Sequence, residues 1–266
     1  MGFRMISLGR VLFAMALAVF GIQYFQYGKY MGGLPPVPPW APGGAIGAYL
    51  VGAVLVAAAI SLAINQKARL SALVIGGLFL LCVLLLHLQH FSAVVHDGGD
   101  RTRAFEPFAL AGAVFVLAAL LPRDTSGAAL ALTSSRNSIL LGRVIFGVSM
   151  VVFGWQHFLY AAFLATLVPA WLPAHLFWIY FTGTGMIAAG LAITFNILGG
   201  VASYGLALMF GLWVLVLHGP RVIAKPHNGD ELSSLFVALA FCGASLIFGG
   251  ALASANCVAA PKQAKT

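Results

Sequence analysis

Two short polar stretches are candidates for chemistry in a chain that is 61% hydrophobic. The sequence reads HDGGD from His96 to Asp100 and HNGDE from His227 to Glu231. An imidazole beside carboxylates can bind a metal ion through nitrogen and oxygen, or act as a general base whose ring the acid orients. The spacing matches no established zinc motif, and Asp, Asn and Gly also form solvated turns. Both interpretations stay open.

Three further histidines lie near the ends of apolar runs. His87 closes the stretch LLLH, His218 closes LVLH, and His157 lies in GWQHF. A buried imidazole needs water or a polar partner, so each could be a cofactor ligand, a proton relay or a substrate contact. Each could equally be an interfacial residue bonded to a carbonyl group. Trp171, in VPAWLP, could cover a pocket or anchor its loop at the lipid headgroups.

The elements that carry these residues are predicted to be transmembrane helices. The 266-residue chain has a mean hydropathy of +1.00 and 8% charged residues, and its apolar runs reach about 20 residues, enough to cross a bilayer as helix. We therefore predict an all-α integral membrane protein that contacts the lipid bilayer and, despite a net charge of +8, no nucleic acid. The eight expected spans are residues 7–27, 43–64, 70–91, 105–122, 139–160, 174–195, 197–218 and 232–253.

The distribution of basic residues predicts the orientation. Nine Lys and Arg residues fall on the side of the N-terminus and five on the other side, and cytoplasmic segments carry the excess. We expect both chain ends in the cytoplasm and both polar stretches on the outer side of a bacterial inner membrane. Cys82, Cys242 and Cys257 occur singly, a pattern that does not indicate a thiol–disulfide centre.

The chain reads as a tandem duplication. GRVLF at 9–13 recurs as GRVIF at 142–146, and FGIQYF at 20–25 recurs as FGWQHF at 153–158, both 133 positions later. From VPPWAP at 37–42, which matches VPAWLP at 168–173, the offset is 131, and it pairs His87 with His218. We predict four-helix units at 1–121 and 139–253, a cytoplasmic linker at 122–138 and a cytoplasmic tail at 254–266. Because each unit has an even number of spans, the expected pseudo-twofold axis runs along the membrane normal.

The second unit is the preferred site, since it has His157 where the first unit has Tyr24. We expect His157 and His218 to face a common cavity beneath Trp171, with His227 and Glu231 at its rim as the other catalytic candidates. His87, His96 and Trp171 are the candidates for holding a cofactor. No metal site is predicted.

These matched features resemble the DoxX family. The resemblance is carried by GR at the start of a unit, GWQHF, the Pro-Trp-Pro loop, YFTGTGMIAAGLAI, the histidine that closes the third helix, and NGDE. It implies a four-helix membrane unit, and a name-giving relative is the small subunit of a thiosulfate:quinone oxidoreductase. The residues that match the family's third-helix histidine and its Asn-Gly-x-Glu-like stretch are His218, Asn228, Gly229 and Glu231. In the first unit Asp97 stands in place of the Asn and Asp100 in place of the Glu.

Three functions remain open. The first is a redox-associated membrane protein, either a quinone-facing subunit or an accessory to a periplasmic or membrane oxidoreductase, whose outer histidines exchange protons with a quinone or ligate haem. The second is a transporter or a small-molecule-binding protein with a site between the repeats. The third is an assembly scaffold without chemistry. Neither cofactor follows from the sequence alone.

Cysteine labelling tests the predicted orientation. Cysteines introduced at positions 98 and 229 should react with a membrane-impermeant thiol reagent added from the periplasmic side, because the charge distribution places both polar stretches there. Labelling only after the inner face is made accessible would reverse the orientation.

Overall fold

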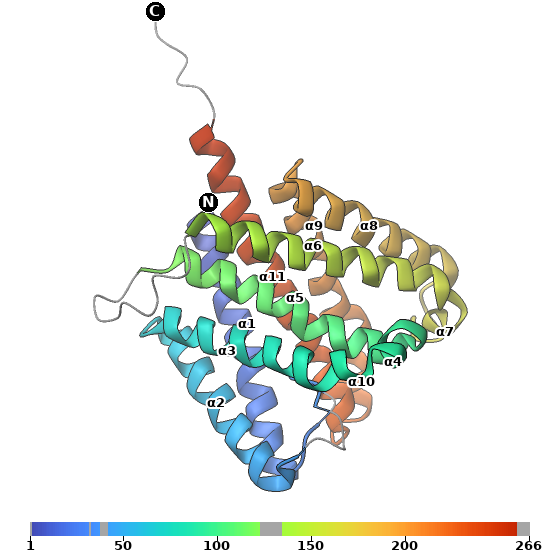
Figure 1. Ribbon diagram of the computed structural model, residues 1–266. Coiled ribbons are helices and arrows are strands. Elements are labelled where there is room, and N and C mark those ends of the chain that lie inside the picture. The colour runs from blue at the N-terminus through green and yellow to red at the C-terminus, as the bar shows by residue number, and fades with distance from the viewer. Residues whose placement is uncertain (1, 32, 38–41, 123–134, 260–266) are drawn as a thin grey trace, which may run out of the picture.

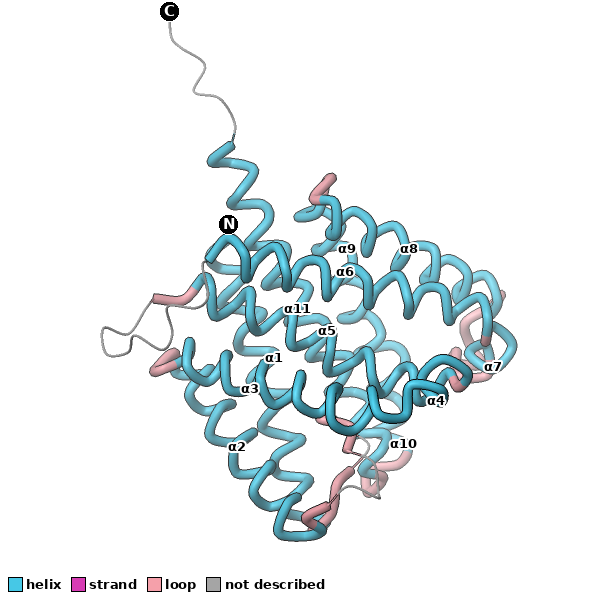
Figure 2. Tube along the Cα trace, viewed as in Figure 1, coloured by secondary structure: helices cyan, strands magenta, loops and turns pink. Residues whose placement is uncertain are grey.

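The computed structural model describes residues 2–31, 33–37, 42–122 and 135–259, without the side chains of residue 135 and of residues 254–259. The predicted linker at 122–138 and the tail at 254–266 thus lie largely outside the described residues, as does Trp40. The described part of the chain consists of helices and loops only (Figure 2).

Eight helices of the described chain are long and apolar enough to cross a membrane, as the sequence predicts. The protein is therefore a multi-pass membrane protein. The helices are α1 (Gly2–Tyr27), α2 (Gly44–Ile64), α3 (Ala68–Cys82) with its continuation to His96, α5 (Gly98–Leu120), α6 (Ser135–Leu159), α8 (His175–Phe195), α9 (Gly199–Leu212) with its continuation to Ala224, and α11 (Gly229–Ala259).

Two of these spans change their helical winding before they end. After α3 the chain forms a π-helical segment η1 (Val83–His87), a short 3-10 turn η2 (Leu88–His90) and α4 (Phe91–His96). After α9 it forms a π-helical segment η4 (Trp213–His218) and α10 (Gly219–Ala224). Each π-helical segment ends at a histidine that the sequence had singled out, and single π turns are frequent at functional sites.

Several helices start earlier than predicted, α5 by the most. The fourth span begins at Gly98 instead of residue 105, and the eighth begins at Gly229 instead of residue 232. Arg101, near the start of the fourth span, has partners on neighbouring helices. Arg101 donates through Nε to the carbonyl of Val94 at 3.2 Å and lies 5.3 Å from the Trp155 ring centroid. The apolar run alone therefore underestimated the length of the helix.

The first and fourth helices of each half form the centre of the bundle (Figure 1). Helix α1 packs against α11 and α2, whereas α6 packs against α5 and α8, and α5 also contacts α11. The most buried span is α11, at 78% of its apolar window, followed by α5 at 61%, compared with 33% for α2 and α8. The other helices lie outside this centre, with α2 and α3 on one side and α8 and α9 on the other.

Glycines let the central helices touch through their backbones. A Cβ on Gly9 would lie 2.4 Å from the carbonyl oxygen of Gly243, and a Cβ on Gly142 would lie 2.4 Å from that of Gly112. The first contact joins α1 to α11 and the second joins α6 to α5. In lipid, helix association depends on such close packing. Gly112 and Gly243, which the offset of 131 pairs, therefore both lie at close helix contacts.

The same kind of contact occurs within each half. A Cβ on Gly21 would lie 2.8 Å from the carbonyl oxygen of Gly52, between α1 and α2. Between α6 and α8, a Cβ on Gly154 would lie 2.5 Å from that of Gly183. These four glycines occupy positions that the two offsets in the sequence pair with each other. This glycine contact therefore occurs at paired positions in the two halves.

Glutamine side chains add polar contacts between the halves. Gln23 on α1 donates to the carbonyl of Gly229 at 2.9 Å and accepts from Ser233 at 3.0 Å, both on α11. Gln156 on α6 donates to the hydroxyl of Thr102 on α5 at 3.3 Å. The two glutamines, which the offset of 133 pairs, thus both form interhelical hydrogen bonds.

The fold also changes the choice of positions for the labelling experiment. A Cβ on Gly98 would lie 2.5 Å from the ring of Tyr160, and one on Gly229 would lie 2.9 Å from Tyr27 and Met31 atoms. A cysteine at either position would disturb the packing. His96 and His227 are exposed neighbours of these glycines and are the better positions for the same test.

The glycine contacts predict a stability difference between two otherwise similar substitutions. Gly142→Ala should lower stability by about 1–3 kcal/mol, as overpacking does in well-packed interiors, because the new Cβ has no room beside the Gly112 carbonyl. Gly77→Ala is the matched control, since no atom lies within 4 Å of its Cβ position; it should be neutral or slightly stabilising. Thermal unfolding in detergent measures both, and equal stabilities would contradict the assigned contact.

Candidate functional site

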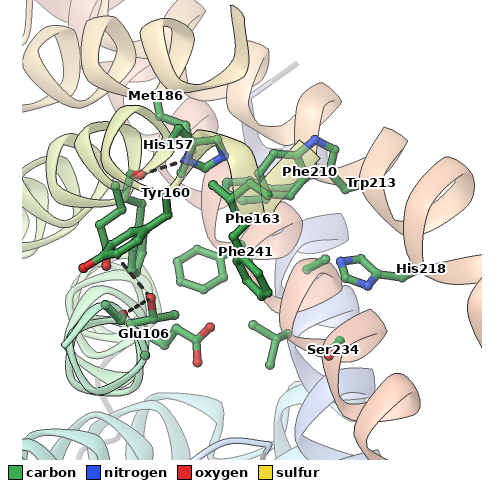
Figure 3. Close-up of a pocket in the computed structure, with 18 of the residues that line it drawn as sticks. Glu106, His157, Tyr160, Phe163, Met186, Phe210, Trp213, His218, Ser234 and Phe241 are labelled. Carbon is green, nitrogen blue, oxygen red and sulfur yellow. Dashed lines mark hydrogen bonds between the residues drawn. The ribbon is translucent and has the colours of Figure 1, made fainter. Parts of the chain in front are cut away.

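A cavity of about 480 Å³ lies where α5 meets the second half of the chain. Its walls come from α5, α6, α8, α9, η4 and α11, and from the short helix α7 (Ala161–Ala165). Most of the lining is apolar, and its aromatic side chains are Phe153, Tyr160, Phe163, Phe210, Trp213 and Phe241. Figure 3 labels Tyr160, Phe163, Phe210, Trp213 and Phe241 around the cavity, together with His157 and His218. The size and the apolar lining are those of a small-molecule site.

His157 lies at the edge of this cavity, near the end of α6. Its ring stacks on Trp213, with centroids 5.9 Å apart and planes 24° from parallel. Its Nδ1 lies 2.8 Å from the carbonyl oxygen of Phe153. Because a carbonyl only accepts, Nδ1 carries the proton of that hydrogen bond, and in the neutral ring Nε2 is then an acceptor. His157 can therefore receive a hydrogen bond, or a proton, through Nε2.

His218 lines the cavity from the end of η4, on a different helix from His157 (Figure 3). Its Nδ1 is buried and has no hydrogen-bond partner among the residues that the structure describes. A buried polar atom without a partner lowers stability by about 1–3 kcal/mol, and such atoms are uncommon in folded proteins. Among the buried side-chain atoms without a hydrogen bond in the described residues, this Nδ1 is the one on a residue that lines the cavity, where a bound molecule could pair with it.

Glu106 projects from α5 into the cavity (Figure 3) and was not among the residues singled out in the sequence. It is the one charged residue between Arg103 and Arg123, a signal that could have marked it. The predicted span began at residue 105 and so placed it at the membrane edge, whereas α5 begins at Gly98. An acidic residue inside an apolar span is a functional candidate by default. At the paired position the second half has Val237.

The two polar stretches of the sequence form helix caps. Asp97 accepts a hydrogen bond from the backbone N–H of Asp100 at 2.8 Å, at the start of α5. Asn228 accepts from the N–H of Asp230 at 2.9 Å and of Glu231 at 3.3 Å, at the start of α11. Side-chain oxygens at this position satisfy N–H groups that have no partner within the helix. The two stretches therefore set where the fourth helix of each half begins.

The remaining candidates of these stretches do not line the main cavity in the described chain. His96 is exposed, with Nδ1 2.8 Å from the carbonyl oxygen of Ser92. His227 is exposed in a separate surface hollow beside Lys225. Glu231 forms ion pairs, at 3.2 Å to Arg221 and 3.7 Å to Lys225.

His87 and Trp171 also lie away from the cavity lining. His87 is buried, and its Nε2 lies 3.1 Å from the carbonyl oxygen of Pro36. Trp171 is 67% exposed. In the segment that precedes it, Phe163 and Leu164 of α7 line the cavity instead. Of the predicted site residues, the structure thus brings His157 and His218 to one cavity. No cluster of three or more His, Cys, Asp or Glu side chains suited to a metal ion occurs among the described residues.

The capping role predicts different outcomes for two neighbouring substitutions. Asp97→Ala should lower stability by about 0.5–2 kcal/mol, because the N–H of Asp100 loses its acceptor. His96→Ala should change stability little, since the ring is exposed and bonds only within its own helical turn. Unfolding monitored by circular dichroism in detergent compares them, and a larger loss for His96→Ala would show that the histidine has a structural role of its own.

Comparisons with models of protein families, with curated protein sequences and with solved structures found no match.

Proposed function

We propose that the protein binds a quinone headgroup in the cavity between α5 and the second half, as a redox-associated subunit in the membrane. The observation that carries this proposal is the buried, unpartnered Nδ1 of His218 in a cavity of about 480 Å³ with aromatic walls. The aromatic rings suit a flat ring that stacks, and His218 offers a polar contact for one of its oxygens. An apolar molecule of this kind can arrive from the bilayer.

The titratable groups of the cavity suit proton exchange. Reduction of a quinone to a quinol takes up two electrons and two protons, and oxidation returns them. His157 can accept through Nε2, and His218 and Glu106 provide further sites where a proton can be held. The electrons would come from, or pass to, a partner oxidoreductase, as the resemblance to the DoxX family implies. In the orientation that we propose, this exchange occurs on the periplasmic side of the inner membrane.

We also propose that the chain is a tandem duplication of a DoxX-like four-helix unit, with a pseudo-twofold axis along the membrane normal. The support is the agreement between the sequence offsets and the paired contacts. The glycine contacts of α1 with α11 correspond to those of α6 with α5, and the contacts of Gln23 correspond to that of Gln156. The two π-helical segments end at paired histidines.

Quinone binding is tested on the purified full-length protein in detergent. A short-chain ubiquinone analogue, measured by equilibrium dialysis, should bind at one site per chain, and native quinone should be extractable from protein prepared under mild conditions. His218→Ala should weaken binding about tenfold, the effect of losing roughly one hydrogen bond. Ala238→Phe should weaken it further, because Ala238 lines the cavity and the larger ring occupies its space.

His227→Ala is the matched control, since His227 is exposed and lines a different hollow. It should bind the analogue as the unmodified protein does. Absence of binding to the unmodified protein, or equal binding by the Ala238→Phe variant, would contradict the proposed site.

A further inference from the structure

We propose that the first half contains a second chamber related to the open cavity, and that the chain fills this chamber with its own residues 33–36. The inference rests on the proposed function only in taking the open cavity as a binding site. Its evidence is a set of contacts around Gly33, Leu34, Pro35 and Pro36, which together are called the plug. Leu34 is fully buried, and the other three residues are buried as well.

Side chains of the first half hold the carbonyl groups of the plug. The hydroxyl of Tyr24 donates to the carbonyl oxygen of Pro35 at 2.7 Å. The Nε2 of His87 lies 3.1 Å from the carbonyl oxygen of Pro36, and the Sγ of Cys82 lies 4.0 Å from the same oxygen. The carbonyl oxygens of the plug therefore provide hydrogen-bond partners for Tyr24 and His87, whose side chains would otherwise be buried without them.

The residues that hold the plug have counterparts around the open cavity. By the offset of 133, Tyr24 pairs with His157. By the offset of 131, His87 pairs with His218 and Cys82 with Trp213. All three counterparts line the open cavity.

The remaining neighbours of the plug repeat this correspondence. A Cβ on Gly33 would lie 2.6 Å from the ring of Phe20 and 3.3 Å from the hydroxyl of Ser233. Phe20 pairs with Phe153 and Ser233 with Thr102, and both counterparts line the open cavity. The plug and the cavity thus occupy the same place in the two halves.

The sequence explains why one chamber is filled and the other is open. Tyr27 and Tyr160 are paired by the offset of 133. After Tyr27 the first half has GKYMGGLPP at 28–36, whereas after Tyr160 the second half has the shorter AAFLATL at 161–167. Glycine and proline disfavour helix, and the longer segment runs into the interior. The shorter segment forms α7, and Phe163 and Leu164 remain in the cavity wall. Gly33 allows the close approach to Phe20 that a side chain would prevent.

The plug also indicates how an occupant of the open cavity is held. In the first half, a ring nitrogen of the histidine that ends the π-helical segment contacts a carbonyl oxygen. We expect the occupant of the open cavity to place an oxygen against the His218 ring as well, at the unpartnered Nδ1 rather than at Nε2, which His87 uses. His157 replaces Tyr24, so an acceptor stands where the first half has a hydroxyl donor.

Loop exchange tests the plug through the reactivity of Cys82. In a full-length variant with Cys242→Ala and Cys257→Ala, Cys82 is the single thiol, and it should react slowly with N-ethylmaleimide because it is buried beside the plug. Replacing residues 28–36 with AAFLATL should open the chamber and raise the labelling rate about tenfold or more, as loss of a protecting segment does. A variant that keeps only Cys242 is the control, and its rate should not change on the same exchange.

A milder substitution guards against a loop exchange that fails to fold. Leu34→Ala removes the buried side chain of the plug and leaves the loop length unchanged, and it should raise the labelling rate of Cys82 by a smaller factor. Cys82 that stays unreactive in a loop-exchange protein with normal gel filtration and unfolding would overturn the inference. If the exchange does not fold, unchanged labelling in Leu34→Ala would overturn it.

The ubiquinone analogue separates this inference from the proposed function. The loop-exchange protein should bind a second molecule of the analogue, and the reverse exchange, GKYMGGLPP in place of residues 161–167, should abolish binding at the open cavity. Should the unmodified protein bind no analogue, the proposed function fails, while the labelling of Cys82 still decides whether a plugged chamber exists.

Discussion

Backbone contact between helices of opposite halves is the constraint on which the rest of the structure depends. Lipid offers no hydrophobic gain when one apolar helix leaves it for another, so the helices are held by close packing and by buried polar contacts. The glycine contacts of Gly9 with Gly243 and of Gly142 with Gly112 bring carbonyl oxygens to where a Cβ would stand. They fix the fourth helix of each half against the first helix of the other. For this reason the cavity takes Thr102 and Glu106 from the first half and His157 from the second.

Many polar side chains within this apolar bundle are paired by other parts of the chain, and His218 Nδ1 is among the buried atoms of the described residues that are not. His157 bonds to its own helix, Gln23 and Gln156 bond across the halves, and Asp97 and Asn228 cap the helices that follow them. His87 obtains a carbonyl from Pro36. His218, at the paired position, has a buried Nδ1 without such a partner in the described chain. Both histidines end the π-helical segment of the third span of their half, but the plug lies against His87 whereas the open cavity lies beside His218.

The sequence was sufficient for features that depend on local composition or on the repeat. Run length predicted the eight spans, and the two offsets pair glycines that the structure places at close helix contacts. Helix starts were less accurate, because a cap such as Asp97 and local partners for Arg101 extend α5 beyond its apolar run. The position of Glu106 in the cavity followed from that extension. Tertiary packing decided the rest: Trp171 is exposed and Leu34 is buried, although both lie in proline-containing segments.

The two halves show two ways of meeting the same physical requirement. A chamber lined by aromatic rings and an imidazole lowers the stability of the fold when it is empty, because the cavity loses packing and the polar atoms lose partners. In the first half, the side chain of Leu34 fills the space, and the carbonyl groups of Pro35 and Pro36 provide the hydrogen-bond partners. The second half lacks that segment, and a molecule that fills the cavity and pairs with His218 would stabilise the folded state by its binding free energy. Two residues of loop length and a Gly-Gly-Leu-Pro-Pro stretch therefore separate a half that completes its own interior from a half whose interior an outside molecule can complete.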